Sequence, residues 1–173
     1  MIPLIIVLLL FVSAVCSATE TAFSSANRIR LKNLAASGSK RAEKALDLAE
    51  NFDKALTAIL IGNNVVNIAS SSLATVFFTE RFGGGSVGIA TLVMTVLVLT
   101  FGEIIPKSLA KENSEKFSVF MAPLLSAFIF IITPLIWIFS GIKNAVVKIV
   151  GHHDDQPSVT EESLNASNSC FMP

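Results

Sequence analysis

The sequence has few of the residues from which catalytic centres and disulfide frameworks are built. It contains two cysteines and two histidines, and 15% of its residues are charged. Cys16 lies in an apolar run and Cys170 in a polar stretch, a pattern that predicts neither a disulfide framework nor a metal motif. His152 and His153 are adjacent in a polar stretch, which indicates a solvated linker. Because a Ser-His-Asp set, a Cys-His pair and a metal-hydrolase motif are all missing, we expect no enzymatic activity.

The sequence also lacks an excess of charge of either sign. Thirteen basic residues balance thirteen acidic ones, so nothing indicates nucleic acid as a partner. The glycine run 83–85 is not followed by Gly-Lys-Ser/Thr, which excludes a phosphate-binding loop of that type. No basic residue precedes the first apolar run, so a signal peptide is not predicted.

Long apolar blocks dominate what is present. Hydrophobic residues make up 52% of the chain and are concentrated in these blocks, which is typical of an α-helical integral membrane protein. We predict an all-α membrane domain over residues 1–150 with spans at about 2–26, 55–79 and 86–106. A lipid membrane is therefore the first expected partner.

Charge predicts how the spans are oriented. Residues 28–54 carry seven basic side chains and are expected to lie on the cytoplasmic side, with the N-terminus outside. Ser37-Gly38-Ser39 is expected to divide residues 28–53 into two juxtamembrane helices.

A fourth apolar block, residues 117–139, would be taken for a span on hydropathy alone. It contains Pro123 and Pro134, which are expected to break or kink it. We predict broken helices over 112–150 that re-enter or lie along the membrane. Residues 151–173 are expected to be a polar cytoplasmic tail that stops before a regulatory domain.

The third span ends in Gly102-Glu103-Ile104-Ile105-Pro106-Lys107. A carboxylate at membrane depth requires a partner. In an α-helix, Pro106 would leave the carbonyl of Gly102 without its hydrogen bond. Two oxygens at one helix break are typical of a hard-cation site. A kinked helix end, from which Glu103 reaches the membrane surface, explains the same residues equally well.

Each of the other two spans carries a polar stripe. Ser17, Glu20, Thr21 and Ser24 are spaced at 0, 3, 4 and 7, which places them on one helix face. In the second span, Gly62-Asn63-Asn64-Val65-Val66-Asn67 is followed by Ser71, and Asn64, Asn67 and Ser71 share a face. Hydrogen bonds between membrane helices are the alternative explanation for both stripes.

The three stripes lie at a similar depth, counted from the flanking basic residues. They supply only oxygen ligands: hydroxyls, amide carbonyls, two carboxylates and one backbone carbonyl. This inventory disfavours zinc and copper and favours Mg²⁺, Ca²⁺ or Na⁺.

On these residues the chain resembles the transmembrane domain of the CNNM/CorC magnesium transporters. The resemblance extends over about residues 1–162 and rests on three motifs in order, one per span: Ser17-Ala18-Thr19-Glu20-Thr21-Ala22-Phe23-Ser24, the asparagine-rich motif 62–67 and the motif 102–107. It implies a homodimer of three-span protomers in the plasma (inner) membrane, with a fourth block that does not span. It also implies Mg²⁺ export that can be coupled to Na⁺ entry, and a cytoplasmic pair of nucleotide-binding CBS modules beyond this chain.

The resemblance implies metal ligands at Ser17, Ser24, Asn64, Asn67, Glu103 and the Gly102 backbone. The residues expected to line or support the site are Glu20, Thr21, Asn63, Ser71, Pro106 and Lys107. The leading hypothesis is a transporter that binds a dehydrated Mg²⁺ between three helices. The alternative is a membrane-embedded Mg²⁺ sensor or scaffold that regulates other proteins without transporting.

Overall fold

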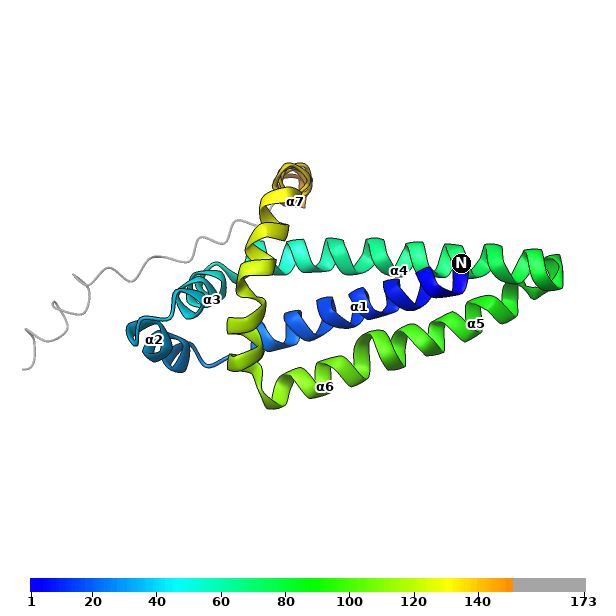
Figure 1. Cartoon of the computed structure of the whole chain (residues 1–173). Coiled ribbons are helices and arrows are strands. Elements are labelled where there is room, and N and C mark those ends of the chain that lie inside the picture. Colours follow the sequence, from blue (N-terminus) through cyan, green and yellow to red (C-terminus); the bar gives the residue numbers. More distant parts are fainter. Residues whose placement is uncertain (151–173) are drawn as a thin grey trace, which may run out of the picture. The chain divides into compact units, whose positions relative to one another are not determined.

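The computed structural model describes residues 1–150, and within this range every regular element is a helix (Figure 1). The elements, in chain order, are α1 (Ile2–Ser25), α2 (Arg28–Ala36), α3 (Lys40–Glu50), α4 (Phe52–Phe82), the short 3₁₀ helix η1 (Gly84–Ser86), α5 (Val87–Leu97), the π-helical η2 (Val98–Ile104), α6 (Ile105–Glu112) and α7 (Ser114–Val150). The expected tail at 151–173, with His152, His153 and Cys170, lies outside the described residues.

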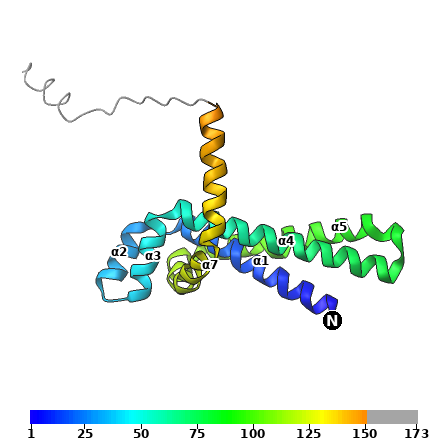
Figure 2. The ribbon, with the colours of Figure 1, turned by 90° about the horizontal axis from the view of Figure 1, so that it is seen from above.

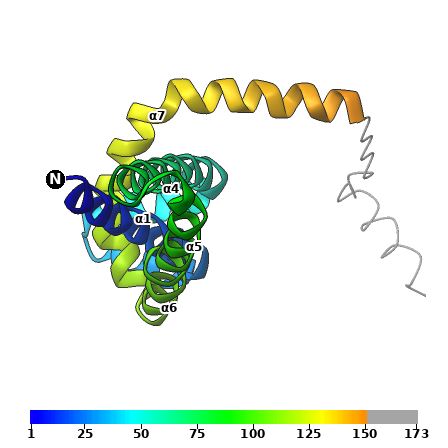
Figure 3. The ribbon, with the colours of Figure 1, turned by 90° about the vertical axis from the view of Figure 1, so that its right-hand side faces the viewer.

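Four helical segments are long and apolar enough to cross a membrane. They are Ile2–Ser25, Phe52–Phe82, Gly84–Glu112 and Ser114–Leu135. The first three pack side by side, with α1 and the continuous α5–η2–α6 running in one direction and α4 in the other (Figures 1 and 3). The helical, membrane-type fold is thus confirmed for the described residues, and the structure has one more candidate span than the three that were predicted.

The two short helices α2 and α3 lie together at one end of this three-helix bundle (Figure 2). Gly38 separates them with a φ of +92°, a conformation that side chains with a Cβ rarely adopt. The Asn27 side chain caps α2 by accepting from the backbone N–H of Ile29 at 2.9 Å, and Ser39 caps α3. The structure therefore confirms the break that Ser37-Gly38-Ser39 predicted between the two short helices.

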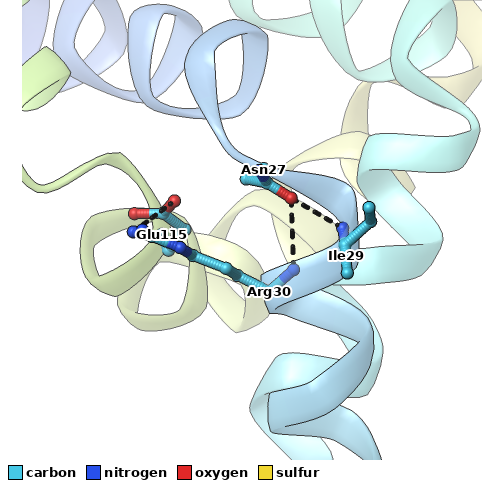
Figure 4. A network of polar contacts seen from close by, with 4 residues as sticks. All are labelled: Asn27, Ile29, Arg30 and Glu115. Carbon is cyan, nitrogen blue, oxygen red and sulfur yellow. Dashed lines mark hydrogen bonds and ion pairs between the residues drawn. The ribbon is translucent and has the colours of Figure 1, made fainter.

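Arg30 connects α2 to the start of α7. Its guanidinium lies 3.5 Å from Glu115, next to the Asn27 cap (Figure 4). The Arg30 side chain is 73% exposed, so this ion pair adds little to stability. Burial does more: Ala122, Leu125 and Ile129 of α7 form a core with residues of α1, α2, α3 and α4.

A close approach between α4 and α7 depends on a glycine. A Cβ at Gly62 would lie 2.6 Å from Cζ of Phe128, inside van der Waals contact. The glycine therefore lets the Phe128 ring pack on the α4 backbone. This contact helps to hold the first part of α7 across the bundle (Figure 1).

The prediction that residues 112–150 form broken helices was wrong. The structure has one continuous helix from Ser114 to Val150, with Pro123 and Pro134 inside it. A proline removes one backbone hydrogen bond but need not end a helix. Half-buried Pro123 lies in the part of α7 that packs on the other helices, whereas Pro134 is exposed. Sequence overestimated the disruption because it cannot weigh this packing.

Pro106 does not break its helix either. It lies in the first turn of α6, and η2 precedes it directly. The N–H of Ile105 donates to the carbonyl of Thr100, five residues back, which widens the helix by one residue per turn. If this five-residue pattern continued, an N–H at position 106 would donate to the carbonyl of Phe101, but Pro106 has no N–H. The carbonyl left without a partner therefore shifts from Gly102, as predicted for an α-helix, toward Phe101.

Candidate cation site

The polar residues that the structure brings together start with Ser13 on α1. Its hydroxyl oxygen is fully buried and lies 2.7 Å from Oδ1 of Asn67 and 2.9 Å from Oδ1 of Asn63, both on α4. A hydroxyl has one proton, so it can donate to only one amide oxygen at a time. The Asn63 and Asn67 amides also carry NH₂ donors, so the cluster is a mixed set of hydroxyl and amide groups.

Ser17 lies one turn further along α1, on the same face as Ser13. Its side chain is 0% exposed, and its hydroxyl has no hydrogen-bond partner among the described residues. A buried hydroxyl without a partner is uncommon and costs free energy unless a ligand or water satisfies it. Ser17, the first of the predicted ligands, is thus a buried hydroxyl without a described partner, and its role as a ligand stays a prediction.

The π-helical η2 brings Gly102 against this part of α1. A Cβ at Gly102 would lie 3.0 Å from the Ser13 hydroxyl, so the absence of a side chain lets the two helices approach. Gly102 is buried and Glu103 is half-buried. Within the described part of the chain, Glu103 forms no ion pair and no side-chain hydrogen bond.

Glu20, in contrast, has a cationic partner. Its carboxylate lies 3.4 Å from Nζ of Lys107 on α6, and the two side chains are 24% and 37% exposed. Glu20 and Lys107 were both expected to line or support the site. The pair neutralises Glu20, so Glu103 is the carboxylate near Ser13 and Ser17 that has no described partner.

These contacts fix the relative depth of α1 and the α5–η2–α6 helix. Ser13 meets Gly102, and seven residues later Glu20 meets Lys107. Because the two helices run in the same direction (Figure 1), Ser17 lies at a depth between these two contacts. Glu103 lies in the same interval on the facing helix.

Several predicted residues are not brought into this cluster. Ser24 is exposed, and its hydroxyl donates to the carbonyl of half-buried Thr21 at 3.1 Å. Asn64 is exposed on α4, whereas Asn63, expected only to support the site, is buried and contacts Ser13. Ser71 is half-buried, and its backbone carbonyl accepts from Thr75.

Sequence reasoning missed Ser13, although a signal was available. Ser13 lies four residues before Ser17 and continues the predicted stripe by one turn toward the N-terminus. Likewise, Asn63 and Asn67 are spaced at i and i+4, which is as good a helical face as Asn64 and Asn67.

The ligands on offer are neutral oxygens and one carboxylate. Among the described residues, no three His, Cys, Asp or Glu side chains are grouped so that they could hold a metal ion. Hydroxyl, amide and carboxylate oxygens are ligands that suit hard cations such as Mg²⁺ and Ca²⁺. Any such site must therefore depend on Glu103 for its charge.

A recess in the described structure lies elsewhere and is chemically unsuited to a cation. It has a volume of about 810 Å³ and lies between α1, α6 and α7, with a lining that is apolar apart from Thr19 and Asn113. Pro106 contributes to this lining. We therefore base the candidate site on the polar cluster.

Comparisons with known proteins bear on the same three helices. A family model described as the cyclin M (CNNM) transmembrane N-terminal domain matches residues 4–167. A UPF0053 protein of Haemophilus influenzae is 39% identical over 148 residues, which are 86% of this chain and 35% of that protein. The UPF0053 inner membrane protein YfjD of Escherichia coli is 33% identical over 156 residues, 88% of this chain and 36% of that protein.

A more distant relative has a functional name. The polyamine export protein of Haemophilus influenzae is 27% identical over 159 residues, covering 84% of this chain and 37% of that protein. The chain thus spans little more than a third of the length of these curated relatives. The match over residues 4–167 confirms the resemblance drawn from the three motifs: the chain belongs to the CNNM family of membrane proteins, a family of the transporter type, and corresponds to its transmembrane domain.

Proposed function

We propose that this domain transports Mg²⁺ and binds the ion, stripped of water, between α1, α4 and η2. The buried Ser17 hydroxyl without a described partner, one turn from the contacts of Ser13 with Asn63 and Asn67, is the observation that supports this most strongly. A protein interior that held only structural hydrogen bonds would pair this hydroxyl. A cation supplies the partner that this hydroxyl lacks, because it interacts with several lone pairs at once.

The ligands that we propose are the Ser17 hydroxyl, the Asn67 amide oxygen, the Glu103 carboxylate and a backbone carbonyl of η2. For the last of these, Gly102 was expected, and the π-helical register favours Phe101 instead. Mg²⁺ prefers six oxygens in octahedral geometry at about 2.1 Å, so the side chains would have to close around it. Asn64 and Ser24 were expected as ligands too, and both would have to turn inward from exposed positions.

Glu103 would carry the charge of the site. A carboxylate at membrane depth is costly without a partner, and Mg²⁺ would be that partner. Lys107 would neutralise Glu20 at the edge of the site. The Glu103 carboxylate would then be the group that attracts cations. Na⁺ prefers the same oxygen ligands, so an exchange of Mg²⁺ for Na⁺ is the coupling that this site would allow.

The domain that we propose lies in the plasma (inner) membrane. Its N-terminus is outside, and α2, α3 and the start of α7 are on the cytoplasmic side. The end of α6 and the start of α7 lie at the same end of the bundle as the basic helix α2 (Figure 1), and this part of the chain carries Lys107, Lys111 and Lys116. A positively charged end is typical of the cytoplasmic side. The name of the Escherichia coli relative supports the membrane assignment.

A homodimer is also part of the proposal. Leu60, Asn64, Ile68, Ser72 and Val76 follow one another at four-residue steps and are all exposed on α4. Two polar side chains on a face that lipid would otherwise cover favour a protein partner there. The relatives are longer than this chain, and the cytoplasmic CBS modules that the resemblance implies would be a further partner.

Two other functions would use the same helices differently. A Mg²⁺ sensor or scaffold would bind the ion without moving it. A polyamine exporter, as the name of one relative suggests, would need several carboxylates along its path, because a polyamine carries several separated ammonium groups. The membrane-embedded acids named here are Glu103 and the neutralised Glu20, which favours a compact ion.

The deciding experiment measures Mg²⁺ and spermidine flux in sealed proteoliposomes for the wild type and Glu103→Ala. We expect Mg²⁺ flux that Glu103→Ala abolishes, and no spermidine flux. Mg²⁺ binding without flux would favour the sensor, and spermidine flux would favour the polyamine exporter. Undiminished Mg²⁺ flux in Glu103→Ala would rule out this site.

A further inference from the structure

Ser13 lies beside the proposed site but has surroundings unlike those of a ligand. Its hydroxyl is fully enclosed, with Asn63 and Asn67 on one side and the Gly102 backbone on another. A Cβ on Gly102 would already be 3.0 Å from this oxygen. A cation needs about six oxygens around it, and this tightly packed position has no room for one.

Ser17, unlike Ser13, has a hydroxyl oxygen that is available to a ligand. Its hydroxyl is buried without a partner, one turn from Ser13. An ion bound at Ser17 that also uses the Asn67 side chain would coordinate an oxygen that accepts from Ser13 at 2.7 Å in the structure. The oxygen has a second lone pair, but the Ser13 proton reduces the negative charge that this oxygen offers to a cation. The same amide oxygen then has two possible partners.

We propose that Ser13 competes with the cation for the side-chain oxygen of Asn67. In the empty site the Ser13 proton satisfies that oxygen; in the loaded site the ion does. Ser13 thereby weakens cation binding and eases release, which suits a transporter better than a store. This inference rests on the proposed function and adds to it a residue that sets the affinity.

Competition predicts that removing the Ser13 hydroxyl raises the Mg²⁺ affinity. Ser13→Ala removes the competing donor, so Mg²⁺ should bind more tightly. The gain should be at most about fivefold, the usual worth of one such hydrogen bond, because the Ser13 proton can also turn to Asn63. A residue that oriented or coordinated the ion would do the opposite, because its loss weakens binding. Tighter binding should also lower the maximal Mg²⁺ flux and the Mg²⁺ concentration at half-maximal flux.

The matched control is Ser70→Ala. Ser70 is as fully buried as Ser13, but its hydroxyl donates to the backbone carbonyl of Asn67 at 3.0 Å, not to the side chain. It should leave the Mg²⁺ affinity unchanged. Ser13→Cys keeps the size and weakens the donor, so an intermediate affinity is expected, and this variant covers the case in which Ser13→Ala does not fold.

The measurement is a Mg²⁺ titration of thermal stability on the full chain in detergent. Ser13→Ala should melt lower than the wild type without Mg²⁺, and saturating Mg²⁺ should reduce that difference. Unchanged or weaker affinity in both Ser13 variants, with Mg²⁺ bound normally by the wild type, would overturn this inference and leave the proposed function intact. A wild type that binds no Mg²⁺ would overturn both.

Discussion

Ser17 has the least satisfied side chain on α1. A hydroxyl with no partner inside a protein contributes nothing to the fold that an alanine would not. A residue that matters for an ion rather than for stability therefore leaves a distinct pattern when it is replaced.

Ser17→Ala should leave the stability of the Mg²⁺-free protein unchanged or raise it, because no hydrogen bond is lost and a buried polar group is removed. It should weaken Mg²⁺ binding about tenfold, which is the lower end of the loss of affinity that substitutions around a metal site cause. Both quantities follow from one thermal-stability titration.

Ser118→Ala is the control for this prediction. Ser118 of α7 is the other buried side chain whose hydroxyl lacks a partner in the described structure. Its replacement should leave the Mg²⁺ affinity as it is. Equal affinities for Ser17→Ala and the wild type would contradict the assignment of Ser17 as a ligand.

The sequence predicted the stripe that contains Ser17 because helical periodicity alone decides which side chains share a face. It could not decide between Asn63 and Asn64, since adjacent residues differ by only 100° around the helix and both faces are partly polar. Nor could it foresee the Glu20–Lys107 pair, which depends on how far α6 is shifted along α1.

Among the elements, η2 is the one that sequence could not specify. A proline predicts that some hydrogen bond is lost, but whether the helix breaks, kinks or widens into a π turn depends on its neighbours. Here the widened turn faces α1 at Gly102. π turns are often found at functional sites, which agrees with the proposed position of Glu103.

Pro106→Ala restores an N–H and should allow the ordinary i→i+4 pattern to replace part of η2. We expect a higher melting temperature, because a backbone hydrogen bond is gained, together with weaker Mg²⁺ binding, because Gly102 and Glu103 rotate relative to α1. Amide hydrogen exchange around residues 102–107 and a Mg²⁺ titration test the two effects. Pro123→Ala in α7 is the control, and an affinity as high as that of the wild type in Pro106→Ala would show that η2 does not position the ligands.

The contact between α4 and α7 supplies a prediction on stability. Gly62→Ala places a methyl group 2.6 Å from the Phe128 ring and should destabilise the protein by about 1–3 kcal/mol, typical of overpacking. Gly88→Ala, where a methyl group meets nothing within 4 Å, should not. Adding Phe128→Leu should rescue Gly62→Ala in thermal melts; equal losses in the single and double variants would mean that the ring is not the cause.

At the scale of the whole molecule, the number of membrane spans is three or four, and the fate of α7 decides between them. Length and composition allow four crossings, whereas the basic residues near both ends of α7, such as Lys116 and Lys143, favour three. The first part of α7 also runs across the three-helix bundle rather than along it (Figure 1). We therefore expect that α7 stays on the cytoplasmic side.

Single cysteines in a variant without Cys16 and Cys170 can test this in intact cells. Ser37, Asn113 and Ile142 are exposed, and Gly84 has open space around it. We expect a membrane-impermeant thiol reagent to label Gly84→Cys from outside, and to label the other three positions only after the membrane is opened. Labelling of Ile142→Cys from outside, with Asn113→Cys still protected, would mean that α7 crosses. The chain beyond α7 would then lie outside the cell, where it could not join a cytoplasmic regulatory domain to the site.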